Sequence, residues 1–354
     1  MNETRSYFSA WKAPSNLAIV KYWGKKGIQE PVNPSISMSL SESVTTTRVK
    51  AVPRERGSVT FRLNNREVPA FLTRIEKFIN NLQDRLPFLS QYDLEIDSQN
   101  TFPHSSGIAS SASAMCTLTF CLADLQQQID PSRSIHIEEV SSIARLGSGS
   151  ASRSVFGGWN LWGRTTVIPE SSDHYAVPLE VAPVFQNYHD DVLIIDSSKK
   201  SVSSSHGHAL MNHHPYREGR ISQALENTTQ LLKHLQSGNT EDFTEVAESE
   251  ALSLHGLMMS SSPAYTLLRP GTLEVIHETR KFREKTGIPV AFSLDAGPNI
   301  HLLYPGSFQE EINKWEETTL KQFCENGQII RDQVGKGPEK IIETTGVGPE
   351  EKQI

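Results

Sequence analysis

The spacing of apolar residues predicts strands in much of the first half of the chain. Residues 17–20 form a short apolar run of the kind found in buried strands. Residues 44–51 alternate between apolar and polar side chains, as an exposed strand does, and residues 58–63 are expected to be its hairpin partner. Further strands are predicted at 92–98, 159–167 and 191–195.

Apolar residues three and four positions apart predict helices, most of them in the second half. Residues 71–85 are the clearest amphipathic case, because Phe71, Ile75 and Phe78 fall on one helical face. Another helix is expected to start near Ala109. Further helices are predicted within 131–146 and at 221–235, 243–258, 272–286 and 309–323, with a strand at 289–294 and its hairpin mate at 300–304.

This change from strands to helices predicts an α+β protein of two domains, residues 1–190 and 191–354. A formal charge of −7 and a pI near 6.0 argue against nucleic-acid binding, because no basic stripe is present. No apolar run approaches the length that spans a membrane. Cys116, Cys121 and Cys324 lack CxxC spacing and are expected to be reduced thiols of a cytoplasmic protein.

A glycine- and serine-rich loop, TFPHSSGIASSASA at residues 101–114, leads into the helix expected near Ala109. The first N–H groups of a helix have no partner within it and lie at the positive end of its dipole, so such a loop can hold phosphate. A serine-rich turn that only caps a buried helix is the alternative. The loop has neither the ending of a Walker A motif nor the glycine spacing of a dinucleotide-binding motif.

Cationic residues at two other places are predicted to bind anions. Three lysines in residues 21–26 directly follow the apolar run at 17–20, although lysines at a solvated strand end would give the same pattern. Arg153 is the one charged residue of GSGSASRSVFGG, residues 147–158. Its planar guanidinium can pair with a carboxylate or a phosphate, and a buried ion pair within the protein is the alternative.

One aspartate and a group of histidines complete the candidate chemistry. Asp295 lies in the turn DAGPN between two predicted strands. Phosphoryl transfer needs phosphate-binding donors, cations for the acceptor's anions and a carboxylate near the attacking hydroxyl. His206, His208, His213 and His214 could bind zinc or nickel. No cysteine or carboxylate near them completes a known motif, so a polar loop lining an anion pocket is favoured and no metal site is expected.

Four segments between residues 13 and 299 carry a family resemblance: APSNLAIVKYWGK, SSGIASSASA, RLGSGSASRSVFGG and SLDAGPN. They resemble, in sequence and order, the mevalonate diphosphate decarboxylase family within the GHMP small-molecule kinases. The strings KYWGK, GSGSASRS and DAGPN distinguish these decarboxylases from their kinase relatives. The resemblance implies a two-domain α+β fold of the GHMP-kinase type, with the active site in the cleft between the domains, and a homodimer.

The resemblance also implies roles for single residues. Asp295 would orient or deprotonate the tertiary 3-hydroxyl of the substrate, Arg153 would hold its C1 carboxylate, and Lys21 would stabilise the transferred phosphoryl group. The substrate would be bound by Tyr22, Lys25, Ser148, Ser150, Arg153 and Ser204, with Tyr22 and Lys25 on the diphosphate. The ATP phosphates would be held by Ser105, Ser106, Gly107, Ser110 and Ser111.

The implied reaction converts (R)-mevalonate 5-diphosphate to isopentenyl diphosphate, with ADP, phosphate and CO₂ as the other products, in isoprenoid biosynthesis. A tertiary alkoxide leaves poorly, so ATP with Mg²⁺ would first phosphorylate the 3-hydroxyl. Ser205 and His208 depart from the family pattern and put the diphosphate specificity in question. A mevalonate 5-phosphate decarboxylase, a mevalonate 3-kinase and, from another class, a non-catalytic ATP- or metal-binding protein are the alternatives.

Overall fold

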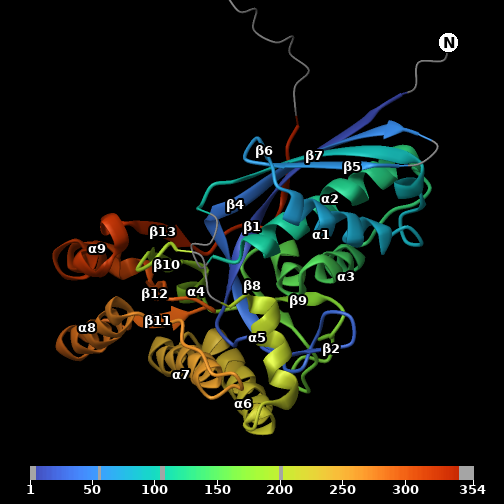
Figure 1. Ribbon diagram of the computed structural model, residues 1–354. Coiled ribbons are helices and arrows are strands. Elements are labelled where there is room, and N and C mark those ends of the chain that lie inside the picture. Colours follow the sequence, from blue (N-terminus) through green and yellow to red (C-terminus); the bar gives the residue numbers. More distant parts are fainter. Residues whose placement is uncertain (1–4, 55–56, 104–107, 199–201, 343–354) are drawn as a thin grey trace, which may run out of the picture.

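The structure, a computed structural model, describes residues 5–54, 57–103, 108–198 and 202–342 (Figure 1). Its larger sheet, here the first sheet, has in spatial order β14 (Glu339–Lys340), β1 (Tyr7–Ala18), β4 (Ser35–Pro53), β7 (Tyr92–Asn100), β5 (Val59–Leu63) and β6 (Arg66–Glu67). Strand β8 (Trp159–Trp162) pairs with β4, and β9 (Ala176–Leu179) pairs with β8. A small separate hairpin joins β2 (Lys25–Lys26) and β3 (Glu30–Pro31).

Strand β4 runs through both parts of the hydrophobic core. Every side chain of residues 35–40 is buried, and Ile36, Met38 and Leu40 belong to a core that also contains residues of the second half of the chain. From residue 43 onward, buried and partly exposed side chains alternate, because one face packs on a helix and the other faces solvent. The alternation predicted for residues 44–51 is thereby confirmed.

Three helices cover the buried face of the first sheet: α1 (Pro69–Asn80), α2 (Ser110–Ile129) and α3 (Ile137–Gly147). The apolar stripe of α1, with Ile75 and Phe78, packs into the same core as Val49 of β4. Helix α2 buries residues on most of its faces, as a helix with apolar residues all round it is expected to do. It starts next to the predicted position at Ala109.

The second sheet has in spatial order β11 (Ala291–Leu294), β12 (Ile300–Pro305), β10 (Tyr188–Leu193) and β13 (Ile329–Gln333). The helices of this half are α4 (Pro183–Gln186), α5 (Ser204–Leu210), α6 (Arg217–Ser237), α7 (Thr240–Met259), α8 (Pro270–Thr286) and α9 (Gln309–Trp315). Helices α6 and α7 lie side by side at the bottom of Figure 1 and place Leu231 and Phe243 in the core that β4 enters. The predicted hairpin of 289–294 and 300–304 is confirmed as β11 and β12.

Three predictions of local structure are wrong. Residues 58–63 do not pair with β4, since β1, β7 and β8 already occupy the edges of that strand; β5 lies parallel to β7 instead. The strand predicted at 159–167 ends at Trp162, where Gly163 turns the chain with φ +104°. A single α-helix was predicted at 309–323, but α9 ends at Trp315. A π-helical segment, Glu316–Leu320, follows it directly.

The chain connects the two halves more than once. The predicted boundary at residue 190 falls within β10, and β14 returns to the first sheet and pairs with β1. The apolar core also continues from the first sheet to α6 and α7. None of the described helices has the length and apolar content needed to cross a bilayer.

Candidate active site

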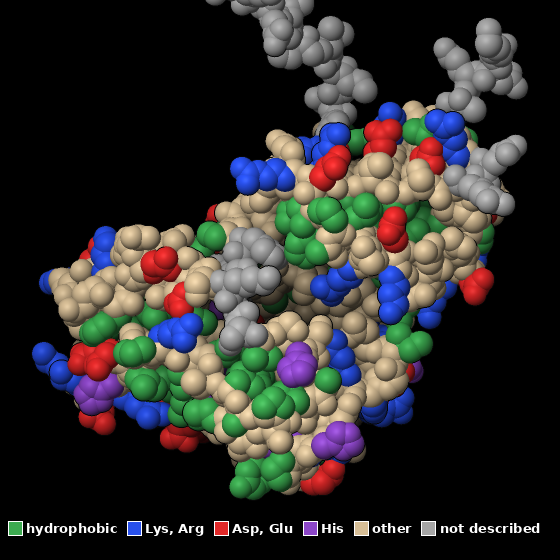
Figure 2. Space-filling model, viewed as in Figure 1, with side chains coloured by type: hydrophobic (Ala, Val, Ile, Leu, Met, Phe, Trp, Pro, Cys, Tyr) green, Lys and Arg blue, Asp and Glu red, His purple; other side chains and the backbone are tan. Residues whose placement is uncertain are grey.

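A cleft lies between the elements of the first sheet and those of α5, α7 and the turn after β11. Figure 2 shows the surface hollowed there, with Lys and Arg side chains beside the hollow. The structure brings together in its lining ten of the residues predicted for the site: Lys21, Tyr22, Lys25, Ser110, Ser111, Ser148, Ser150, Arg153, Ser204 and Asp295. The predictions for Ser105, Ser106 and Gly107 lie outside the described residues.

Lys21 and Asp295 form an ion pair at the base of the cleft, with 3.0 Å between Nζ and Oδ1. Lys21 follows β1 and is 2% exposed, whereas the Asp295 side chain is 25% exposed in the cleft. The Lys21 ammonium also donates to Ser293 Oγ on β11 at 2.9 Å and to the carbonyl of Ala18. The carboxylate is therefore accessible to a bound hydroxyl, while the lysine is fixed behind it.

Arg153 lies in the 3₁₀ segment η2 (Gly149–Val155), which the small side chains of GSGSAS allow to pass close to β1 and β4. Its guanidinium donates to Ser35 Oγ at 2.7 Å, Ser37 Oγ at 3.0 Å and Asn16 Oδ1 at 3.3 Å. Within the described part of the chain, no carboxylate lies at ion-pair distance from Arg153. Burial lowers the pKa of Arg153 to about 10, so the side chain is still cationic at neutral pH.

Tyr22, Lys25 and His208 form a second polar region of the cleft. The His208 ring packs at a tilt against the rings of Tyr22 and Trp23, with ring centroids 4.5 and 4.7 Å apart. The Gly24 N–H donates to His208 Nδ1 at 3.0 Å, which places the proton of a neutral ring on Nε2. Burial, and then the charge of Lys25, lower the pKa of His208 to about 3. His208 is therefore a neutral hydrogen-bond donor.

The Tyr22 hydroxyl is buried and has no hydrogen-bond partner among the described residues. Burial raises the pKa of this phenol, so it keeps its proton. Burial also lowers the pKa of Lys25, with a smaller contribution from nearby Arg74. A neutral donor without a partner and a poorly solvated cation are both stabilised by an anion placed between them.

Hydroxyl groups connect the start of α2 to η2. Ser111 Oγ lies 3.1 Å from Ser148 Oγ, which lies 3.4 Å from Ser150 Oγ. No side chain caps the N-terminus of α2 in the described structure. The N–H groups of Ser110 and Ala112 donate to the carbonyls of Ile108 and Ala109. The start of α2 therefore offers an anion the side chains of Ser110 and Ser111, which line the cleft, and the positive end of the helix dipole.

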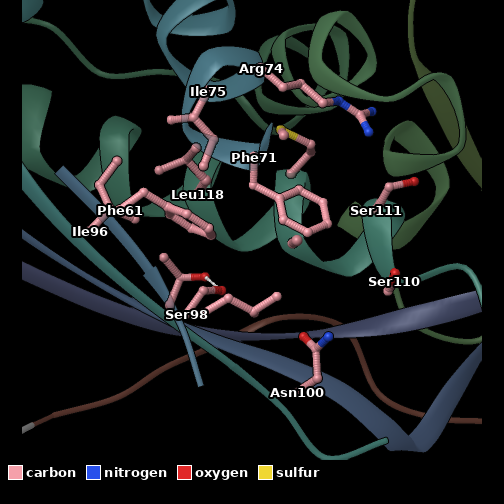
Figure 3. Close-up of a pocket in the computed structure, with 14 residues that line it drawn as sticks. Phe61, Phe71, Arg74, Ile75, Ile96, Ser98, Asn100, Ser110, Ser111 and Leu118 are labelled. Atoms are coloured by element: carbon pink, nitrogen blue, oxygen red, sulfur yellow. Dashed lines mark hydrogen bonds between the residues drawn. The ribbon is translucent and has the colours of Figure 1, made fainter. Parts of the chain in front are cut away.

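A second, apolar pocket opens beside the beginning of α2 (Figure 3). Phe61, Phe71, Ile75, Ile96 and Leu118 line it, and Ser98 and Asn100 supply polar groups at one side. Arg74, Ser110 and Ser111 line both this pocket and the cleft. The two cavities therefore meet at the proposed phosphate-binding segment.

Charge in the cleft is opposite to that of the whole chain. The described lining carries the cations Lys21, Lys25, Arg74 and Arg153 and one carboxylate, Asp295. The formal charge of the chain is −7, so the cationic cleft is a local feature that favours anionic ligands.

The four candidate histidines do not form a metal site: among described residues, no three His, Cys, Asp or Glu side chains are placed to hold a metal ion.

Some residues in or next to the cleft were not predicted. Of the cleft lining, Asn16 Oδ1 accepts from Arg153, and Arg74 donates to the carbonyl of Gly147 at 2.8 Å. Outside the lining, the buried His255 has its Nε2 3.0 Å from the Asp295 carbonyl. Asn16 lies in the segment that carries the family resemblance, which could have indicated it. Arg74 and His255 lie on helices α1 and α7, far from any motif, and no local signal marks them.

The two sheets, their helices and the cationic cleft define a two-domain α+β protein of GHMP-kinase-like fold. Residues 13–176 match the family model of the diphosphomevalonate decarboxylase-like N-terminal domain, and residues 192–346 match that of the mevalonate 5-diphosphate decarboxylase C-terminal domain. The chain therefore belongs to the diphosphomevalonate decarboxylase family, and the predicted fold class is confirmed.

Individual relatives cover nearly the whole chain. The diphosphomevalonate decarboxylase of Gibberella zeae is 30% identical over 98% of this chain and 97% of its own. The crystal structure of mevalonate diphosphate decarboxylase from Staphylococcus aureus is 29% identical, with a TM-score of 0.85 over 96% of this chain and 99% of that one. A structure of MDDEF in complex with MVAPP, AMPPCP and magnesium is 25% identical, with a TM-score of 0.83 over 95% and 99% of the two chains.

Proposed function

We propose that this cleft catalyses the ATP-dependent decarboxylation of (R)-mevalonate 5-diphosphate to isopentenyl diphosphate, with release of ADP, phosphate and CO₂. The observation that carries the proposal is the pair of Lys21 and Asp295 beside a buried, cationic Arg153 that has no carboxylate partner in the described structure. A substrate with a hydroxyl next to Asp295 and a carboxylate next to Arg153 complements both groups.

In the first step, the substrate 3-hydroxyl attacks the γ-phosphorus of ATP and ADP leaves. Asp295 accepts or orients the hydroxyl proton, and its ion pair with Lys21 holds the carboxylate in place. The Lys21 ammonium lies beside the developing charge, where a fixed cation in a site with little water stabilises the transition state.

In the second step, the 3-phosphate leaves as inorganic phosphate and the C1–C2 bond breaks. The electron pair of that bond forms the new alkene, and the C1 carboxylate departs as CO₂. Arg153 holds this carboxylate and does not protonate it, because even its lowered pKa of about 10 lies well above that of a carboxylic acid. Ser148 and Ser150 supply further donors, Tyr22 and Lys25 bind the diphosphate, and Ser204 reaches the substrate from α5.

The nucleotide would bind with its phosphates at the start of α2, near Ser110 and Ser111 and the undescribed Ser105, Ser106 and Gly107. The adjoining apolar pocket is suited to a planar base, which Phe71 and Ile75 would contact (Figure 3). Mg²⁺ binds to nucleotide phosphates and neutralises their charge. The cleft lining offers it serine hydroxyls and few carboxylates, so we infer that the ion enters with ATP and is held mainly by the phosphates.

Three further parts of the proposal concern the whole protein. The domains are assigned to residues 1–190 and 191–354. A homodimer follows from the family resemblance. A cytoplasmic location is supported by the free, buried thiols of Cys116, Cys121 and Cys324.

A decarboxylase specific for mevalonate 5-phosphate is the second candidate. The cleft lining at Ser205 and His208 contributes hydroxyl and neutral imidazole donors, and His208 is kept uncharged by its burial. Neutral donors at Ser205 and His208 stabilise a less negative phosphate group better, relative to a diphosphate, than cationic side chains would. Measuring CO₂ formation from mevalonate 5-diphosphate and from mevalonate 5-phosphate distinguishes the two candidate functions.

Substitution of Asp295 by asparagine tests the proposed role of this carboxylate. Asparagine keeps the size of the side chain but is a poor proton acceptor, so phosphorylation is expected to fall at least ~10²-fold. ATP affinity should stay within about three-fold, because binding depends on other groups. Rapid-quench measurement of ADP and nucleotide titration give the two quantities. The exposed Asp84→Asn variant is the matched control, and full turnover by Asp295→Asn would remove Asp295 from the mechanism.

A further inference from the structure

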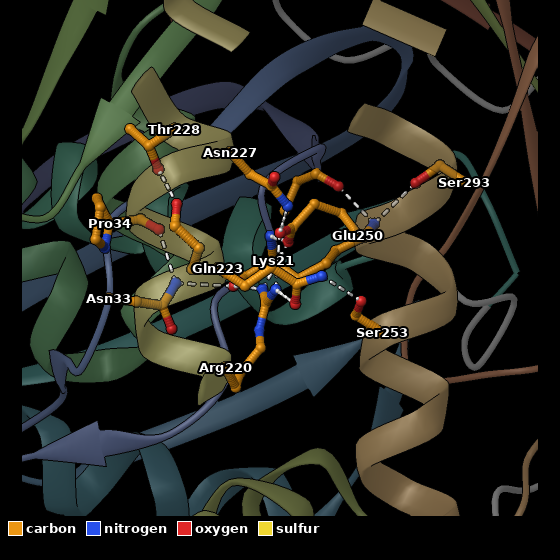
Figure 4. Close-up of polar contacts among 12 residues, drawn as sticks. Lys21, Asn33, Pro34, Arg220, Gln223, Asn227, Thr228, Glu250, Ser253 and Ser293 are labelled. Atoms are coloured by element: carbon orange, nitrogen blue, oxygen red, sulfur yellow. Dashed lines mark hydrogen bonds and ion pairs between the residues drawn. The ribbon is translucent and has the colours of Figure 1, made fainter. Parts of the chain in front are cut away.

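A buried ion pair lies directly behind Lys21 (Figure 4). Arg220 of α6 and Glu250 of α7 pair through two bonds, Nη1 to Oε1 at 2.7 Å and Nη2 to Oε2 at 2.6 Å. Their side chains are 2% and 0% exposed. Asn227, about two helical turns further along α6, donates to Glu250 Oε1 at 2.6 Å. The carboxylate of Glu250 is thus fixed by two partners on the neighbouring helix.

The same pair holds the backbone of Lys21. The Lys21 N–H donates to Glu250 Oε2 at 2.8 Å, and Arg220 Nη2 donates to the Lys21 carbonyl at 3.2 Å. Asn33 Nδ2 donates to the same carbonyl at 3.0 Å. Lys21 lies beyond the end of β1, whose pairing with β4 stops at Ala18 in the described structure. Its peptide groups are therefore held by side chains and not by the sheet.

Besides its contacts with Ala18 and Asn33, Lys21 contacts the second half of the chain through both its ammonium and its backbone. The ammonium contacts Ser293 and Asp295, which belong to β11 and the turn after it. The backbone contacts Arg220 and Glu250 on α6 and α7. Lys21 follows β1, a strand of the first sheet. Its contacts nevertheless fix its position relative to Asp295, which follows β11 of the second sheet.

We propose that Arg220 and Glu250 are positioning residues that hold the Lys21 backbone so that its ammonium stays aligned with Asp295. The inference rests on the proposed function, since it assigns the pair to the phosphoryl-transfer step. A buried ion pair by itself adds little stability compared with apolar side chains of similar volume. Apolar side chains would fill the space, but they could not accept the Lys21 N–H or donate to its carbonyl.

The test replaces both partners, as Arg220→Met with Glu250→Met, so that no buried charge is left alone. The folded state should remain, whereas kcat for ADP and CO₂ formation should fall ~10- to 100-fold, as expected for a reacting group displaced by a fraction of an ångström to about 1 Å. The KM values for ATP and for mevalonate 5-diphosphate should stay within about three-fold, because neither residue contacts ligand. A kcat equal to that of the wild type would overturn the proposal.

Two matched variants separate positioning from general stability. Arg283→Met with Glu248→Met removes a neighbouring ion pair between α8 and α7, in which Nη1 and Oε1 lie 2.6 Å apart, and should leave kcat unchanged. Arg280, the other partner of Glu248, is 48% exposed and stays solvated in this variant. Arg220→Met with Glu250→Gln keeps an acceptor for the Lys21 N–H and should recover most of the lost kcat. Equal losses of kcat in all three double variants would overturn the proposal, because they would indicate a general effect of losing buried charge.

A third measurement does not depend on the reaction. Glu250→Asp keeps the charge pair, and with it the fold, but withdraws the acceptor by one methylene group. Hydrogen exchange of the Lys21 amide should then accelerate at least ~10-fold, while amides in the middle of α7 keep their protection. Unchanged exchange at Lys21 would overturn the proposal even if the wild-type protein turned over neither substrate, an outcome that would refute the proposed function separately.

Discussion

Arg153 shows how a single side chain can define a ligand. Its neighbours Ser35, Ser37 and Asn16 are neutral acceptors, and burial disfavours its charge, as its lowered pKa indicates. An isolated buried cation is costly unless an anion completes the site. In the proposed reaction the substrate carboxylate would supply that anion, and it is the group that would leave as CO₂.

Lysine in place of Arg153 should lower kcat/KM for decarboxylation ~10²-fold, because an ammonium cannot hold a carboxylate through two parallel bonds. Steady-state kinetics with ADP and CO₂ detection gives the value, and Arg133→Lys at an exposed position is the control. Wild-type kinetics in Arg153→Lys would mean that the guanidinium has a structural role only.

Residues were predictable where their local sequence is unusual. Arg153 stands alone among glycines and serines, Asp295 lies in a tight turn, and the family resemblance assigned roles to both. Arg220 and Glu250 had no such signal, because both lie on helices with many polar residues. Their importance arises only where the tertiary fold brings α6 and α7 against Lys21.

At the scale of elements, η2 and the segment after β1 determine each other's position. A Cβ atom on Gly149 would lie 2.8 Å from Tyr22 Oη and 2.9 Å from the ring of Trp162. Only glycine therefore allows η2 to lie this close to Tyr22. The small residues around Arg153, which the sequence suggested for ligand binding, serve this packing as well.

Gly149→Ala should displace Tyr22 and raise the KM for mevalonate 5-diphosphate at least ~10-fold, since the ring and hydroxyl leave the diphosphate region. The KM for ATP should change less, because the nucleotide lies at α2. In contrast, Gly219→Ala on α6 places a Cβ atom in open space. This control should keep wild-type kinetics and gain up to ~1 kcal/mol in stability. Equal KM values in both variants would contradict the account of η2.

Elements with strong periodicity were predictable, whereas pairing between distant strands was not. The helical spacing of apolar residues correctly located α6, α7 and α8, and it located α1 except for its end, which lies at Asn80 and not at the predicted residue 85. The partner of β5 depends on which edges of β4 are already occupied, a property of the assembled sheet that residues 58–63 do not encode. Helix α9 gives way to a π turn at the buried Glu316, and no periodicity of residues 309–323 indicates this change.

At the scale of the molecule, the second sheet contains buried carboxyl groups far from the cleft lining. Asp191 on β10 and Glu316 after α9 are both 0% exposed, and Tyr304 donates to Asp191 Oδ2 at 2.5 Å. Burial raises the pKa of both carboxyl groups, and their mutual repulsion raises that of Glu316 further. The pair therefore holds a proton in the folded protein at a pH where the unfolded chain has lost it.

This pair should make the protein less stable as the pH rises. A raised folded-state pKa adds stability below the unfolded pKa of Glu316, and that stability is lost as the pH rises through the folded pKa. Between pH 5 and 8 the loss should approach ~1.4 kcal/mol per pH unit for one proton. Glu316→Gln, whose amide can donate to Asp191, should remove this slope in denaturant unfolding, whereas the exposed Glu317→Gln should keep it. Parallel slopes for wild type and Glu316→Gln would contradict the assignment.

The protein as a whole is acidic, yet it contains a cationic cleft that lies next to an apolar pocket and has one carboxylate, Asp295, in its described lining. The most direct test measures ADP and CO₂ together, with ATP and either mevalonate 5-diphosphate or mevalonate 5-phosphate as substrate. Equal amounts of ADP and CO₂, formed from the diphosphate in strong preference, are the predicted result. ADP without CO₂, or a preference for the monophosphate, would contradict the assigned reaction or its substrate.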